Sequence, residues 1–103
     1  MRIYISGAIT NEPNYISKFH KAEIDLKAEG HLALNPARIG NVVQNNTPWP
    51  LEYEDFMMID EILLKQCDAI YMLKGYEHSA GALHELMIAT RFRKEIMYEE
   101  ELP

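Results

Sequence analysis

Residues 1–10, MRIYISGAIT, determine how the rest of the chain is interpreted. The first six are mostly apolar and rich in β-forming residues, so MRIYIS predicts a buried strand. Gly7 and the polar, proline-containing sequence after it predict a loop over residues 7–14. A glycine after a buried strand allows backbone amides to approach a ligand. For Ser6, Gly7 and Ile9 two interpretations therefore stay open, a ligand-binding loop and a simple turn that ends the strand.

Helical periodicity and short apolar runs alternate along the rest of the chain. Helices are expected from Asn14 to Gly30, from Leu51 to Gln66 and from about Ser79 to about Arg93, and strands at 31–36, 67–73 and 95–99. Residues 37–50 contain prolines, asparagines and a glycine without a clear period, which predicts a long loop. This order predicts one α/β domain over residues 1–103. We expect a Rossmann-like (flavodoxin-like) parallel sheet of about four to five strands with helices on both faces.

The first expected helix has an apolar and a charged side. Periodicity predicts that Ile16, Phe19, Ala22 and Leu26 face the core and that Lys18, Lys21, Glu23 and Lys27 lie largely outside. Gly30 is expected to end this helix, because glycine favours the position just after a helix.

Composition excludes several classes of function. The chain has 103 residues, 48% of them hydrophobic, and a net charge of −6, which argues against nonspecific nucleic-acid binding. One cysteine cannot form an internal disulfide, and the four histidines show no metal-binding spacing, so neither a metal nor another cofactor is expected. Neither a leader sequence nor an apolar run of ~20 residues is present, so a cytoplasmic protein without a membrane segment is expected.

The expected topology brings three loops together. In parallel α/β sheets, ligands bind beyond the carboxyl ends of the strands. Residues 7–12, 36–50 and 74–82 all follow expected strands, so they should converge on one rim of the sheet.

Two carboxylates on apolar helix faces are candidates for chemistry at this rim. Asp60 has Phe56 and Leu63 as neighbours on its helix, so it should face inward as a polar anchor or as a catalytic acid. Glu85 lies among Ala82, Leu86 and Ala89, where a carboxylate costs free energy unless it is paired or used. A position at the helix edge remains the alternative for Glu85.

The start of the third helix combines Ser79 with Gly81 and neighbouring alanines. Serine is a common N-cap residue. The same arrangement also accepts an anion such as phosphate, because backbone N–H groups and the helix dipole point at the ligand. Both interpretations remain open from the pattern itself.

Four segments together resemble a known superfamily. IYISGAIT, the helix with Asp60, CDAIYML and SAGALHE resemble, in the same order, the nucleoside 2-deoxyribosyltransferase superfamily. The site pattern is most similar to the 2′-deoxynucleoside 5′-monophosphate N-glycosidases, and the overall sequence resembles short phage and bacterial relatives of undefined function. The resemblance implies the fold named above and a small-molecule nucleotide or nucleoside as ligand.

The resemblance also implies residue roles. Glu85 matches the carboxylate that attacks the anomeric carbon, Asp60 an acidic residue near the base, and Tyr4 a strand tyrosine that orients the nucleophile. Gly7 lies in the sugar-facing loop. The transferases on free nucleosides have a carboxylate near the position of Ser79, and this carboxylate would repel a 5′-phosphate. The neutral serine favours a monophosphate.

The sequence departs from the monophosphate hydrolases in one loop. Thr10, Asn11 and Glu12 stand where those enzymes have a basic, glycine-rich run, so Arg38, Lys74 and His78 are candidates to replace that positive charge. Trp49 and Tyr53 are candidates to stack on a base, and an anchor of its own loop is the alternative for Trp49.

The expected function is hydrolysis of the base–sugar bond of a (deoxy)nucleoside 5′-monophosphate with Glu85 as nucleophile. The alternatives are a deoxyribosyltransferase on free nucleosides and a nucleotide-binding protein without turnover. The resemblance also implies a homodimer or a larger homo-oligomer.

Overall fold

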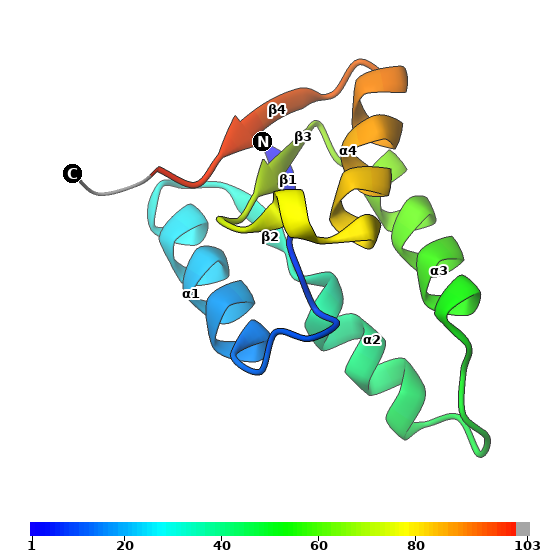
Figure 1. Ribbon diagram of the computed structural model, residues 1–103. Helices are drawn as coiled ribbons and strands as arrows, with labels where there is room; N and C mark the ends of the chain where they lie inside the picture. Colours follow the sequence, from blue (N-terminus) through cyan, green and yellow to red (C-terminus); the bar gives the residue numbers. More distant parts are fainter. Residues whose placement is uncertain (101–103) are drawn as a thin grey trace.

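The four strands of the sheet all run parallel, as the alternation of strands and helices requires (Figure 1). The computed structural model describes residues 1–100. The strand order is β2 (Leu32–Leu34), β1 (Arg2–Ser6), β3 (Ala69–Met72) and β4 (Glu95–Tyr98). The chain is therefore an α/β protein with a Rossmann-like, flavodoxin-like sheet, which confirms the expected fold class. The described residues contain four strands, the lower number of the expected range.

Helices cover both faces of this sheet (Figure 1). One face packs on α1 (Tyr15–Ala28), and the other packs on α3 (Tyr53–Lys65) and α4 (Ala80–Arg91). The alternation of side chains along β1 decides which residues face which layer. Ile3 and Ile5 belong to the core on the α1 side, whereas Tyr4 belongs to the core under α3 and α4.

The buried side of α1 differs from the predicted side at two residues. Phe19, Ala22 and Leu26 are buried as predicted. Ile16 is 58% exposed, because Tyr15, one turn before Phe19, packs against the core in its place. Glu23 was expected outside but is 2% exposed.

Glu23 tolerates burial because several hydrogen-bond donors surround it. Its carboxylate accepts hydrogen bonds from Lys27 (2.7 Å), from Asn35 Nδ2 (3.2 Å) and from Arg38. Burial alone would raise the pKa of this carboxyl, but these hydrogen bonds and the charge of Arg38 outweigh burial and lower the pKa. The cluster fastens α1 to the segment that follows β2.

The predicted loop over residues 37–50 is wrong over most of its length, because α2 (Pro36–Asn45) occupies it. Asn35 is the N-cap of α2, and its side chain accepts a hydrogen bond from the backbone N–H of Arg38. Pro36 stands in the first turn, where proline is favoured because its missing N–H has no partner there in any helix. A proline that ends a strand can therefore also start a helix.

The sheet has a topological switch point at β1. The chain leaves β1 toward β2 on one side and pairs β1 with β3 on the other. Crevices for ligands form at the carboxyl ends of the strands at such points. Among the helices of residues 1–100, none is both long and apolar enough to cross a membrane.

Candidate active site

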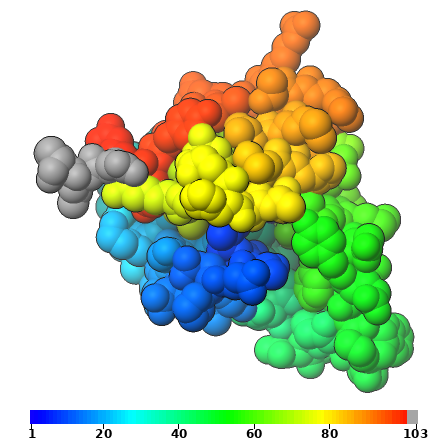
Figure 2. Space-filling view, viewed as in Figure 1, coloured from blue at the N-terminus to red at the C-terminus, as the bar shows by residue number. Residues whose placement is uncertain are grey.

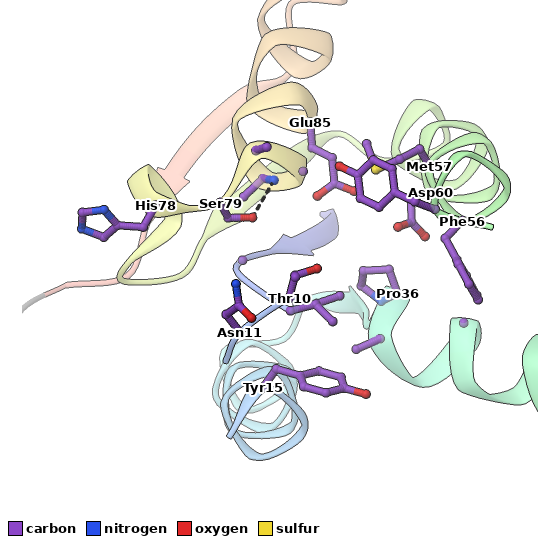
Figure 3. Close-up of a pocket in the computed structure, with 18 of the residues that line it drawn as sticks. Thr10, Asn11, Tyr15, Pro36, Phe56, Met57, Asp60, His78, Ser79 and Glu85 are labelled. Carbon is purple, nitrogen blue, oxygen red and sulfur yellow. Dashed lines mark hydrogen bonds between the residues drawn. The ribbon is translucent and has the colours of Figure 1, made fainter. Parts of the chain in front are cut away.

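A cleft of about 660 Å³ lies beyond the carboxyl end of β1 (Figure 3). Its walls come from the loop after β1, from α2, from α3 and from the start of α4. All three loops predicted to converge contribute to it: Gly7, Ile9, Thr10 and Asn11 from the first, Pro36, Ala37, Gly40 and Asn41 from the second, and residues 78–82 from the third. In the space-filling view the blue loop after β1 lies against the yellow start of α4, with green α3 beside them (Figure 2).

Glu85 forms part of the cleft wall and is held by two residues of β1. The side chain is 6% exposed. Ser6 Oγ donates a hydrogen bond of 2.7 Å to Glu85 Oε1, and the hydroxyl of Tyr4 donates another to Oε2. Tyr4 and Ser6 are two residues apart on a strand, so both side chains reach the same face of the sheet. The carboxylate is thus fixed at both oxygens by residues of the central strand.

Burial dominates the electrostatics of Glu85. Burial raises the pKa of this carboxyl, the hydrogen bonds from Tyr4 and Ser6 lower it, and the negative charge of Asp60 raises it again, to about 7. Burial and the neighbouring Glu85 charge also raise the pKa of Tyr4 well above its ordinary value, so Tyr4 is a neutral donor at neutral pH. Glu85 is therefore present near pH 7 in both protonation states.

Asp60 supplies a second carboxyl group to the same cleft. It projects from α3 between Phe56 and Met57 on one side and Glu85 on the other (Figure 3). Burial raises the pKa of Asp60 to about 6. The prediction that Asp60 faces inward is confirmed.

The start of α4 forms the opposite end of the cleft. Ser79 is the N-cap, and its Oγ accepts a hydrogen bond of 3.1 Å from the backbone N–H of Ala82. The N–H groups of Ala80 and Gly81 belong to the first turn, where a helix offers no carbonyl partner. A Cβ on Gly81 would lie 3.2 Å from the Tyr53 hydroxyl, so a glycine leaves room for this hydroxyl. Because the Ser79 hydroxyl only accepts in this bond, its own proton remains available for donation.

The positive charges lie beside the cleft and not in it. The cleft wall contains neither lysine nor arginine within residues 1–100, and the ring of His78 points away from the two carboxyl groups (Figure 3). A smaller cavity of about 240 Å³ adjoins it and shares Thr10, Asn11 and His78. Lys18 and Lys74 line that second cavity.

Three predicted binding residues do not line the cleft. Ser6 is fully buried beneath it, where its hydroxyl is bonded to Glu85. Arg38 extends from α2 to Glu23 and is absent from the cleft wall, so it does not supply the missing positive charge. Trp49 lies in the turn between α2 and α3 and is 64% exposed, away from the wall. Gly7 does line the cleft, and packing against Leu73 is a second reason for a glycine at this position. A Cβ there would approach Leu73 to 2.9 Å.

The sequence did not indicate Tyr15 as a wall residue, and it placed Asn41 at the rim only as part of residues 36–50, although both line the cleft. Asn41 lies in the segment that was expected to be a loop, so the sequence analysis did not place it on a helix, although it belongs to α2. Tyr15 lies directly after the loop, one turn before Phe19, and this spacing could have identified it. Among the described residues, no group of three or more histidine, cysteine or acidic side chains is placed to hold a metal ion.

The raised pKa of Glu85 predicts a variant that is more stable than the wild type. The carboxyl binds its proton more tightly in the folded protein than in the unfolded chain, so stability falls as the pH rises from about 4.5 to about 7 and stays reduced above that. Glu85→Gln removes this cost and keeps groups that hydrogen-bond with Tyr4 and Ser6. At about pH 8 we expect the free energy of unfolding to rise by up to about 3 kcal/mol, with little change near pH 5.

Urea unfolding of both proteins at the two pH values measures this difference. Glu77→Gln, at an exposed position, is the matched control and should show no pH-dependent gain. A Glu85→Gln protein that is less stable than the wild type at both pH values would contradict the prediction.

The fold and the cleft define a class: a parallel α/β protein with one buried and one half-buried carboxyl group, those of Glu85 and Asp60, at the switch point of its sheet. Within this class, residues 1–98 match the family described as Domain of unknown function (DUF4406), and the chain belongs to that family. No curated protein sequence matches the chain.

Proposed function

We propose that this protein is an N-glycosidase that hydrolyses the base–sugar bond of a nucleoside 5′-monophosphate, with a deoxyribonucleotide as the favoured substrate. The observation that carries this proposal is the placement of Glu85. Its carboxylate lines the cleft and is fixed at both oxygens by Tyr4 and Ser6. A carboxylate fixed in this way suits attack on an anomeric carbon and stabilises the positive charge that develops on the sugar.

In the first step of the proposed reaction, a Glu85 oxygen forms a bond to C1′ while the bond from C1′ to the base breaks. The electron pair of the broken bond goes to the base nitrogen. Asp60, in its protonated form, donates a proton to the leaving base. Its raised pKa of about 6 leaves a minor fraction of the group protonated near neutral pH, and this fraction carries the step while Glu85 is ionised.

In the second step, water attacks C1′ and the bond between C1′ and Glu85 breaks. Asp60, now ionised, accepts a proton from the water. The products are the free base and the sugar 5-phosphate, and both carboxyl groups return to their starting states. Two carboxyl groups that exchange acid and base roles in this way are typical of retaining glycosidases.

The proposed phosphate site is the start of α4. The N–H groups of the first turn and the Ser79 hydroxyl supply donors, and the helix dipole favours an anion there. Thr10 and Asn11 lie across the cleft from Ser79 and add polar side chains (Figure 3). In the adjoining cavity Lys74 adds positive potential, whereas Lys18 is paired there with Glu12 at 2.9 Å. These features support a monophosphate over an uncharged 5′-hydroxyl.

Incubation of the full-length protein with each deoxynucleoside 5′-monophosphate in turn tests the proposal. We expect chromatography to show a free base and an equal amount of deoxyribose 5-phosphate from at least one of them. Base exchange between two free nucleosides, with little hydrolysis, would instead identify a transferase. Calorimetric binding without any product would identify a binding protein, and either outcome would refute the hydrolase.

A further inference from the structure

We propose that the smaller cavity beside the cleft binds the second phosphate group of a nucleoside 5′-diphosphate, so that the site accepts diphosphates as well as monophosphates. This inference rests on the proposed function, because it extends the substrate beyond a first phosphate at the start of α4. The smaller cavity shares Thr10, Asn11 and His78 with the cleft, and His78 directly precedes Ser79, the N-cap of α4. The two cavities therefore meet beside the proposed phosphate site.

The size and the wall of the smaller cavity suit an anionic group. Its volume of about 240 Å³ is several times the ~30 Å³ that one water molecule occupies in the liquid, so a group of several heavy atoms fits. The ring of His78 points away from Glu85 and Asp60 (Figure 3). A histidine ring has an N–H donor in each of its protonation states, and the wall also contains lysine, threonine and asparagine donors.

The charges in this wall leave one lysine without an ion pair. Glu12 Oε2 lies 2.9 Å from Lys18 Nζ, and Glu12 Oε1 accepts a hydrogen bond of 3.1 Å from the backbone N–H of Asn14. Both oxygens of Glu12 are thus occupied, and Lys18 balances its charge. Lys74 forms no ion pair with any of residues 1–100. Its ammonium group is therefore the net positive charge of the wall.

Two glutamates near Lys74 along the chain or in space lie outside the cavity wall. Glu99 accepts a hydrogen bond of 2.9 Å from the backbone N–H of Lys74, and Glu77 lies on the short helix that follows Gly75. Neither glutamate lines the cavity. Lys74 is therefore the residue of this segment that presents charge to the cavity.

The loop after β1 forms the border between the two cavities and is held by a turn. The backbone N–H of Glu12 donates a hydrogen bond of 3.2 Å to the carbonyl of Ile9. Asn11 in this turn has a φ of 63°, which asparagine adopts more readily than most residues. Within residues 1–100, no group accepts a hydrogen bond from the backbone N–H of Thr10 or of Asn11. These two N–H groups remain available to an anion at the border.

The order of groups along the two cavities matches a nucleoside 5′-diphosphate. Glu85 faces the sugar, the start of α4 takes the first phosphate, and Lys74 and His78 line the space that follows. A monophosphate leaves this space to water. A second phosphate adds negative charge and acceptor oxygens, which the ammonium group and the ring N–H bind. The reaction at C1′ is the same for both substrates.

Calorimetric titration of the full-length Glu85→Gln variant tests this inference, because bound nucleotides stay intact on it. The ligands are the four deoxynucleoside 5′-diphosphates and the corresponding monophosphates. At least one diphosphate should bind about tenfold more tightly than its monophosphate. Inorganic pyrophosphate should bind more weakly than this diphosphate, because it has neither a sugar nor a base to contact the cleft.

Lys74→Gln in the same background tests the role of the lysine. Lys74 is exposed, so the loss should be moderate, about fivefold for the diphosphate and less than about twofold for the monophosphate. Lys65→Gln, at the far end of α3, removes the same charge but lines neither cavity. This matched control should change neither affinity. Circular dichroism verifies that each variant is folded.

Several results would overturn the inference. Equal affinity for the mono- and diphosphate of every base would do so, as would the absence of nucleotide binding. Equal losses for both ligands in Lys74→Gln would mean that the smaller cavity holds the first phosphate. Pyrophosphate that binds more tightly than every diphosphate nucleotide would identify a site for the free anion.

Base release by the wild type, measured separately, distinguishes this inference from the proposed function. A preference for the diphosphate that depends on Lys74, without base release, would support the second phosphate site and refute only the hydrolase. Base release from monophosphates without such a preference would refute only the second phosphate site.

Discussion

Glu85→Gln is expected to lower the rate of base release by about 10⁴-fold or more, because an amide cannot form the bond to C1′ that the proposed reaction requires. The side chain keeps its length and can still hydrogen-bond to Tyr4 and Ser6, so the loss should appear in kcat with little change in nucleotide affinity. Single-turnover assays with chromatographic detection of the base, together with calorimetric binding of the nucleotide, separate the two effects.

A trapping experiment distinguishes a nucleophile from a residue that only positions the sugar. A nucleotide with a 2′-fluoro-arabino sugar should release its base slowly and leave the sugar phosphate on wild-type Glu85, because the electronegative fluorine slows the second step. Mass spectrometry should detect this adduct on the wild type and not on Glu85→Gln. Ser6→Ala, which removes one hydrogen bond to Glu85, should still form the adduct but at a lower rate. A Glu85→Gln protein within about tenfold of wild-type activity would contradict the role of Glu85.

Much of the environment of Glu85 could be predicted from the sequence, because it depends on local periodicity. Strand alternation requires that Tyr4 and Ser6 share a face, and helical periodicity puts Glu85 on the buried side of α4. The parallel topology then brings that helix over β1 and β3. Each step uses only the period of one element and the rule for ligand sites in parallel sheets.

Contacts between distant elements could not be predicted in this way. Periodicity assigned Glu23 to the outer side of α1, because it does not show that Asn35 and Arg38 arrive from another element to pair with the carboxylate. The same contact removes Arg38 from the list of phosphate ligands. Arg38 was predicted to supply positive charge near the phosphate. Its pairing with Glu23, which lies on another helix, cannot be seen from the local sequence.

The sequence analysis failed to predict α2 for a different reason. The prolines and asparagines of residues 37–50 suggested a loop, although Asn35 and Pro36 form a good helix start. The missed helix supplies Gly40 and Asn41 to the cleft. The segment contains residues that disfavour a helix, and it follows residues that favour the start of one. The structure contains the helix, with Asn35 as its N-cap and Pro36 in its first turn.

Ser79→Asp is expected to lower kcat/KM for the 5′-monophosphate by about 10³-fold, because a carboxylate ~4 Å from the phosphate in a partly dry cleft costs several kcal/mol. Aspartate is as good an N-cap as serine, so the hydrogen bond from the Ala82 N–H and the start of α4 should be retained. Activity on the free nucleoside should be unchanged or higher. The measurement compares kcat/KM for the two substrates with the same base.

Ser79→Asn is the matched control, because asparagine has nearly the same shape as aspartate, caps helices equally well and carries no charge. If the start of α4 holds the phosphate, Ser79→Asn should lose at most about tenfold on the monophosphate, and the difference between the two variants measures the charge effect. Equal losses for both variants would mean that position 79 acts through shape or capping and that the phosphate binds elsewhere. Raising the salt concentration should reduce the difference only modestly, since buried or partly buried charges are screened less than exposed ones. The pair of variants therefore isolates the one property by which Ser79 favours a monophosphate over a free nucleoside.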